Sequence, residues 1–118
     1  MTATINALLD RASAARTLDA GLLHDVANAL RPIFPKAPNL PEALSDPTEA
    51  VLHLIDRCLP TWTISLTGKA IEPDGHWRCY LRETTGRDDD AVIGHGQAPV
   101  VTLALLQALL RVAVVKAG

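Results

Sequence analysis

Two arginines and one tyrosine alternate with apolar residues in a short segment and could bind an anion. Arg78, Tyr80 and Arg82 are two positions apart, so in a β-strand their side chains lie on one face. The segment 62–67 alternates in the same way and adds hydroxyl groups to that face. The candidate ligand-binding residues are Thr63, Ser65, Thr67, Arg78, Tyr80 and Arg82. Guanidinium groups and hydroxyls suit phosphate or carboxylate, and a phenol ring offers a stacking surface.

The same residues also fit a plainer interpretation. They could form an ordinary solvated sheet face, or one that the N-terminal helices cover. Two buried arginines would need acidic partners, and the run Asp88–Asp90 could fold back to neutralise them. The alternating apolar residues would point into the core instead; these are Trp62, Ile64, Leu66, Trp77, Cys79 and Leu81.

No other set of residues predicts a catalytic, metal or cofactor site. A metal site could be imagined from His76, Cys79, His95 and Asp88–Asp90, but zinc sites prefer more compact pairs of ligands. His76 and Cys79 are three positions apart, so on a strand their side chains would point to opposite faces. The aspartates lack the downstream Glu and the glycine of a calcium loop. Neither a Gly-x-Ser-x-Gly elbow nor a glycine-rich loop that opens a helix is present, so the sequence favours a non-enzymatic protein.

Length, charge and cysteine content narrow the class of protein. At 118 residues the chain suits a single domain, 1–118. The balance of 11 basic and 13 acidic residues argues against a general nucleic-acid binder, which would need clustered Lys and Arg, and leaves room for a local basic patch. We expect Cys58 and Cys79 to be buried thiols, with one disulfide or a reactive thiol as the alternative. The first residues lack the pattern of a signal peptide, and the longest apolar segment, 98–115, is too polar for a membrane span. We therefore expect a cytoplasmic protein that does not enter a membrane.

The first half of the chain is predicted to be helical. Apolar residues recur at helical spacing over 4–16, and a second helix follows Thr17 or Asp19 and closes at Pro32. The two helices form an N-terminal hairpin, 1–31. Five prolines between positions 32 and 47 predict an extended connector, 32–46. Asp46 and Pro47 then form a helix start, with Asp46 as the cap and Pro47 at the first helical position.

The body of the fold, 47–118, is predicted to follow the order αβββα. After Pro60 the apolar period changes from about 3.6 to 2, and strands are expected over 62–67, 77–82 and 91–96. The turn 73–75 and the loop 86–90 connect them directly, which implies an antiparallel meander. The predicted class is therefore α+β, in the order α-α-α-β-β-β-α, with helices packed on a three-stranded antiparallel sheet.

The last predicted helix, from about Pro99 to Lys116, is apolar on nearly all sides. Such a helix is buried on more than one side. One side should face the sheet, and the other should face either the N-terminal hairpin or a second copy of the chain. If the hairpin leaves it uncovered, we expect a homodimer through this C-terminal helix.

Several phrases of the sequence resemble a family. They are the amphipathic start at 5–11 followed by Thr-Leu-Asp-Ala at 17–20, Asp-Pro-Thr-Glu-Ala at 46–50, Leu-Pro-Thr-Trp-Thr-Ile at 59–64, and the Ala/Leu-rich run 96–111. Together they resemble small phage and prophage accessory proteins of the phage ABA-sandwich type. The chain departs from that pattern at Ala98, where a threonine cap is expected before Pro99. The resemblance implies a phage-associated accessory protein and transfers no catalytic residue.

Three functional hypotheses follow. The first is a non-enzymatic phage or prophage accessory protein that binds a host protein in the host cytoplasm, such as a component of the host's defence. The second is a small-ligand or nucleotide-binding module that uses the polar sheet face. The third is a small hydrolase.

Overall fold

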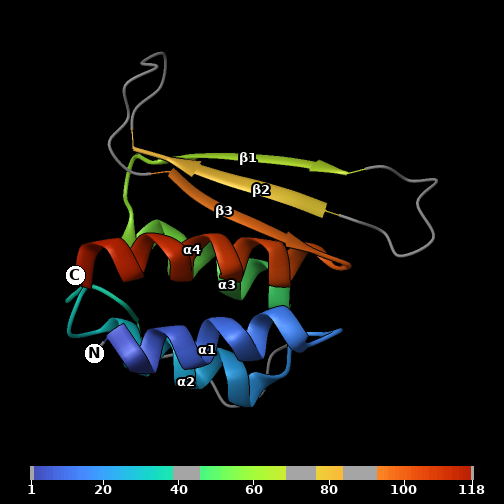
Figure 1. Cartoon of the computed structure of the whole chain (residues 1–118). Helices are drawn as coiled ribbons and strands as arrows, with labels where there is room; N and C mark the ends of the chain where they lie inside the picture. The colour runs from blue at the N-terminus through green and yellow to red at the C-terminus, as the bar shows by residue number, and fades with distance from the viewer. Residues whose placement is uncertain (1, 39–45, 69–76, 84–92, 118) are drawn as a thin grey trace.

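The computed structural model describes residues 2–38, 46–68, 77–83 and 93–117, and within them it shows an α+β fold with the expected order of elements (Figure 1). The elements are α1 (Thr2–Ala14), α2 (Ala20–Leu30), α3 (Pro47–Cys58), β1 (Thr63–Gly68), β2 (Trp77–Arg82), β3 (Ile93–Ala98) and α4 (Val101–Ala117). The predicted turn at 73–75 and loop at 86–90 lie outside the described residues, as do positions 39–45 of the predicted connector.

Local capping signals set the starts of two helices. Asp46 is in an extended conformation, and its side chain accepts a hydrogen bond of 3.1 Å from the backbone N–H of Glu49. Asp19, rather than Thr17, caps α2 and accepts a hydrogen bond of 2.7 Å from the N–H of Leu22. Each cap satisfies a donor that the first helical turn otherwise leaves free.

The three strands form an open antiparallel sheet in the order β1-β2-β3. The register places Ile64 opposite Leu81 and Leu66 opposite Cys79, so these apolar side chains share the face toward the helices. Leu81 and Cys79 are buried, whereas Ile64 and Leu66 remain 38% exposed. The central strand is therefore covered on this face, and the edge strand β1 is covered only in part.

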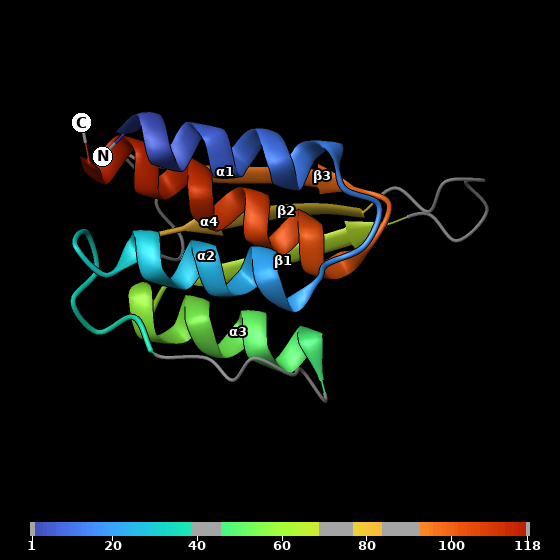
Figure 2. The ribbon, with the colours of Figure 1, turned by 90° about the horizontal axis from the view of Figure 1, so that it is seen from below.

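The elements stack in three layers (Figures 1 and 2). The sheet is the first layer, and α4 runs beneath β2 and β3 with α3 beside it. The hairpin of α1 and α2 forms the third layer, and α1 packs on the side of α4 that faces away from the sheet. The predicted apolar surplus of the last helix is thus used within one chain, and positions 103–110 are all buried.

Two glycines let α4 approach the backbone of β3. A Cβ atom on Gly96 would overlap the carbonyl oxygen of Ala104, and one on Gly94 would lie 2.5 Å from the carbonyl oxygen of Ala108. Any side chain at these positions would hold the helix away from the sheet. The glycines therefore fix the close contact between β3 and α4.

Gln107 is the buried polar residue of this core, with only 3% of its surface exposed. Its side-chain oxygen accepts a hydrogen bond of 3.2 Å from the backbone N–H of Gln97 on β3. Its side-chain nitrogen donates a hydrogen bond of 3.5 Å to the carbonyl of Ala12 at the end of α1. One side chain thus links all three layers.

Among the described helices, none combines the length and apolar character that a bilayer crossing requires.

Candidate functional site

The six polar residues predicted from the sequence lie together on the outer face of the sheet. Cross-strand register pairs Thr63 with Arg82, Ser65 with Tyr80, and Thr67 with Arg78. No helix or strand of the described chain covers this face (Figure 1). We define the outer face as these six residues together with three residues of β3, namely Ile93, His95 and Gln97.

An aromatic pair occupies the middle of the outer face. The rings of Tyr80 and His95 have centroids 5.0 Å apart and planes inclined by 38°. Both side chains are half-buried, whereas Arg78 and Arg82 on either side of Tyr80 are exposed. The arrangement is a half-buried aromatic centre flanked by two exposed cations, which suits carboxylate or phosphate groups.

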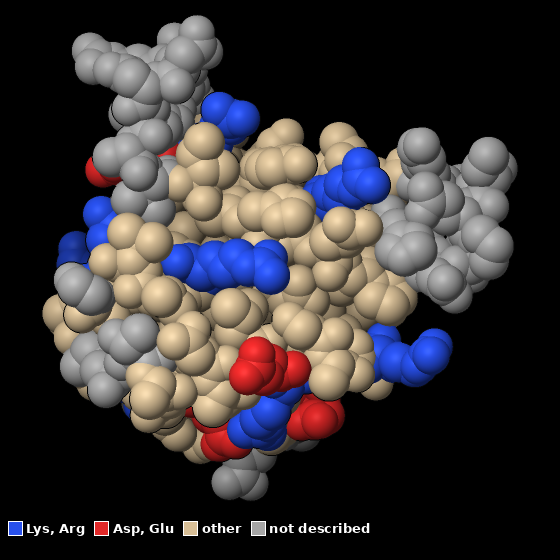
Figure 3. Space-filling view, in the orientation of Figure 1, with Lys and Arg blue, Asp and Glu red and all other residues tan. Residues whose placement is uncertain are grey.

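The charged side chains of the three strands are positive. The strands themselves contain no Asp or Glu, and Arg78 and Arg82 are their charged residues. On the side seen in Figure 3, Lys and Arg are spread over all three layers, whereas most Asp and Glu gather over the lowest layer. Acidic groups of a partner would therefore be attracted to Arg78 and Arg82.

His95 was missed as an outer-face residue by the sequence reasoning, which considered it only as a metal ligand. The signal was present, because the alternation over Ile93–Ala98 places His95 and Gln97 on one face. What the sequence lacked was the register that sets His95 opposite Tyr80.

The two edges of the sheet differ in their hydrogen bonding. At the β3 edge, the carbonyl of His95 accepts a hydrogen bond from the guanidinium of Arg111. The N–H of Gln97 donates to the side chain of Gln107. Both partners come from α4, so side chains occupy two of the outward backbone groups of β3. Such coverage is a common protection against unwanted strand pairing.

At the β1 edge the alternation leaves backbone groups open. In an antiparallel sheet, alternate residues direct their N–H and C=O to opposite sides of the strand. Because His95 and Gln97 direct these groups outward from β3, Tyr80 and Arg78 direct theirs toward β1. The N–H and C=O groups of Ile64 and Leu66 then face the free edge, and no hydrogen bond within the described part of the chain reaches them.

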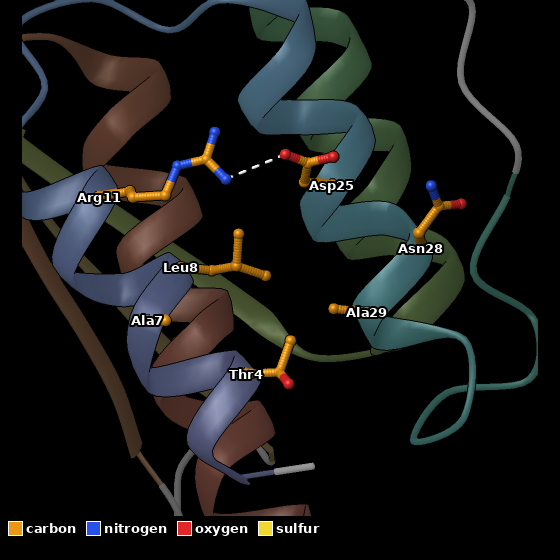
Figure 4. Close-up of a pocket in the computed structure, with 7 residues that line it drawn as sticks. All are labelled: Thr4, Ala7, Leu8, Arg11, Asp25, Asn28 and Ala29. Atoms are coloured by element: carbon orange, nitrogen blue, oxygen red, sulfur yellow. Dashed lines mark hydrogen bonds and ion pairs between the residues drawn. The ribbon is translucent and has the colours of Figure 1, made fainter.

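A shallow groove of about 490 Å³ lies between α1 and α2 (Figure 4). Its lining residues are Thr4, Ala7, Leu8, Arg11, Asp25, Asn28 and Ala29. Arg11 and Asp25 face each other across it and form an ion pair of 2.9 Å, half-exposed on both sides. The groove has a mostly apolar lining, and the charge of Arg11 is already matched. The groove was not predicted, because two separate helices contribute its lining residues.

Both cysteines are free, buried thiols, as expected. Burial raises the pKa of Cys58 to about 12 and that of Cys79 to about 11. Both therefore stay protonated at neutral pH, which makes them poor nucleophiles and poor metal ligands.

The imagined metal site is only partly within the described residues. Cys79 faces the helices and His95 the outer face, so these two cannot share an ion. His76 and Asp88–Asp90 lie outside the described residues. Within the parts of the chain that are described, no group of three or more His, Cys, Asp or Glu side chains could hold a metal ion.

Comparisons with protein-family models, with curated proteins and with solved structures gave no match. The resemblance to phage accessory proteins stays a prediction.

Proposed function

We propose that this protein is a non-enzymatic binding protein that recognises a partner protein through the outer face and the β1 edge of its sheet. The observation that carries the proposal is the asymmetry of the sheet. One face packs on α4, and the opposite face presents Arg78, Tyr80 and Arg82 with no described element over it. A rigid surface that combines arginine with an aromatic centre is typical of a protein interface.

The resemblance supplies the biological setting of the proposal. A phage or prophage accessory protein would act in the cytoplasm of its host, and the partner would be a host protein, such as a component of host defence. The phrases that support this setting are helix starts and the entry to β1, which are structural motifs. They say nothing of the target.

A homodimer through the C-terminal helix is the other partner hypothesis, and it has less support. We expected it only if the N-terminal hairpin left that helix uncovered, and α1 packs on it. Val115, which is 56% exposed near the end of α4, is the large apolar side chain that this helix still presents.

Site-specific cross-linking tests the proposed function. A photo-reactive amino acid replaces Ser65 on the outer face, and in a matched chain it replaces Asp56 on the exposed side of α3. In cells that carry the protein, we expect a discrete cross-linked product from position 65 and none from position 56. Arg78→Ala/Arg82→Ala should weaken that product. Equal products from both positions, or a product from position 56 alone, would contradict the proposal.

A small anionic ligand is the second candidate, favoured by the two cations on either side of the Tyr80–His95 pair. A ligand that binds only the folded chain raises its stability, by about 2.7 kcal/mol at a hundred times the Kd. Nucleotides and phosphorylated metabolites should then raise the Tm of the wild type but not that of Arg78→Ala/Arg82→Ala. An equal rise in both chains would exclude the outer face as the ligand site.

The small hydrolase gains no support from the thiols, since burial keeps them protonated.

A further inference from the structure

The difference between the two edges of the sheet indicates how a partner would bind. The β3 edge is occupied by Arg111 and Gln107 of α4. The β1 edge presents the N–H and C=O groups of Ile64 and Leu66, and its six residues, Thr63–Gly68, include no charge and no proline. Charges and prolines are the usual means of blocking an edge strand. An extended segment of a partner can therefore add to the sheet at β1.

The side chains of β1 determine what such a segment should carry. On the outer face, β1 offers only Thr63, Ser65 and Thr67, which are small. Arg82 and Arg78 stand directly behind Thr63 and Thr67 on β2. Neighbouring strands are about 4.8 Å apart, so a long arginine side chain can reach over a threonine to the next strand. Toward the helices, the half-exposed Ile64 and Leu66 offer apolar surface.

We propose that the partner contributes a strand that pairs antiparallel to β1 and carries acidic residues four positions apart. These would lie opposite Thr63 and Thr67, where they meet Arg82 and Arg78. Apolar residues would lie opposite Ile64 and Leu66, and a small polar residue opposite Ser65. The recognised pattern is acidic–apolar–small–apolar–acidic. This inference rests on the proposed function and adds the chemistry of the partner.

Charge favours this occupant over a second copy of the chain. Two copies that paired through β1 would place Arg78 and Arg82 of both chains on one continuous face, with no acidic residue in any strand. A second copy would supply no carboxylate to either pair of arginines. A strand with two carboxylates compensates both arginines.

In the test, a nine-residue peptide with the central sequence Glu-Val-Thr-Val-Glu is titrated into the full chain. NMR records the chemical shifts of the protein's backbone amides. We expect the largest shifts at the amides of Ile64 and Leu66. Replacement of both glutamates by glutamine, or Arg78→Ala/Arg82→Ala in the protein, should weaken binding roughly fivefold to twentyfold, since exposed charge pairs have modest effects. A peptide of the same composition with Val-Glu-Thr-Glu-Val at its centre should bind as weakly as the glutamine peptide.

N-methylation of the peptide backbone distinguishes strand addition from other modes without altering the protein. In antiparallel pairing, the two valines exchange hydrogen bonds with Ile64 and Leu66, and the central threonine directs its N–H away. N-methylation of either valine should abolish binding, whereas N-methylation of the threonine should not.

Three results would overturn the inference. The first is binding that is indifferent to N-methylation of the valines, because the peptide would then lie across the face. The second is no binding of any peptide while cross-links from position 65 persist, which would leave the proposed function intact. The third is a concentration-dependent shift of Ile64 and Leu66 without peptide, which would show pairing with a second copy.

Discussion

Gly96→Ala should be among the most destabilising single-methyl additions in this protein. The new Cβ would overlap the carbonyl oxygen of Ala104 and lie 2.9 Å from the backbone nitrogen of Ala108. Both atoms belong to the backbone of α4, so no side-chain rotation relieves the overlap. The helix cannot simply retreat, because α1 packs on its other side. Relief requires α4 or β3 to move by on the order of 1 Å.

The magnitude follows from two opposing effects. Overpacking a close-packed core costs typically 1–3 kcal/mol, and a clash with backbone on both sides belongs at or above the upper end. Replacing glycine by alanine lowers the conformational entropy of the unfolded chain, which raises the free energy of unfolding by about 0.4–1 kcal/mol. We expect a net loss of about 3 kcal/mol in the free energy of unfolding, which lowers the Tm by roughly 10 °C.

Gly68→Ala is the matched control. Its Cβ would also be too close to a neighbour, 2.5 Å from the Trp77 ring, but that neighbour is a half-buried side chain at the end of the strand. The ring can shift, so we expect a loss of about 1 kcal/mol or less. Urea unfolding followed by circular dichroism gives both values. If Gly96→Ala costs no more than Gly68→Ala, α4 does not rest on the backbone of β3 and the account of the core is wrong.

Three further outcomes are expected. Asp46→Ala removes the side chain that accepts the N–H of Glu49, so it should lower the free energy of unfolding by about 1 kcal/mol; an unchanged denaturation midpoint would tell against the cap. Burial raises the thiol pKa of Cys79 to about 11 and of Cys58 to about 12 from 9.0, so the unfolded chain loses these protons first. The thiol contribution to stability should be constant below pH 9 and fall by a few kcal/mol between about pH 9 and 12; the decline should be smaller when each cysteine is replaced by alanine, and an identical decline would refute this origin. A chain that begins at Pro41 lacks the hairpin and should associate through the uncovered α4, as light scattering would show; a monomeric, soluble product would mean that α1 is not needed to cover it.

Local signals in the sequence were sufficient for the order of the elements. Asp46 and Pro47 marked the start of α3 because a cap and a first-turn proline act within a few residues. Alternation placed Arg78, Tyr80 and Arg82 on one face because strand geometry has a period of two. The α+β class and the outer-face set of residues therefore needed no tertiary information.

Contacts between distant segments could not be predicted in this way. Gln107 joins Ala12 to Gln97, and no local pattern records a contact across that separation. In the sequence, Gln107 is one polar residue within the apolar segment 98–115, and nothing near it indicates either partner. The same limit applies to the β1 edge, since its exposure depends on α4 lying under β2 and β3 instead of under β1.

Amide hydrogen exchange of the free protein tests the central claim, that β1 is the binding edge of the sheet, most directly. The N–H groups of Ile64 and Leu66 should exchange rapidly, because they face the open edge. Those of Ser65 and Gln97 should be protected, since one faces β2 and the other donates to Gln107. On addition of the Glu-Val-Thr-Val-Glu peptide, Ile64 and Leu66 should become protected as well. Slow exchange at Ile64 and Leu66 in the free chain, or rapid exchange at Gln97, would contradict the account.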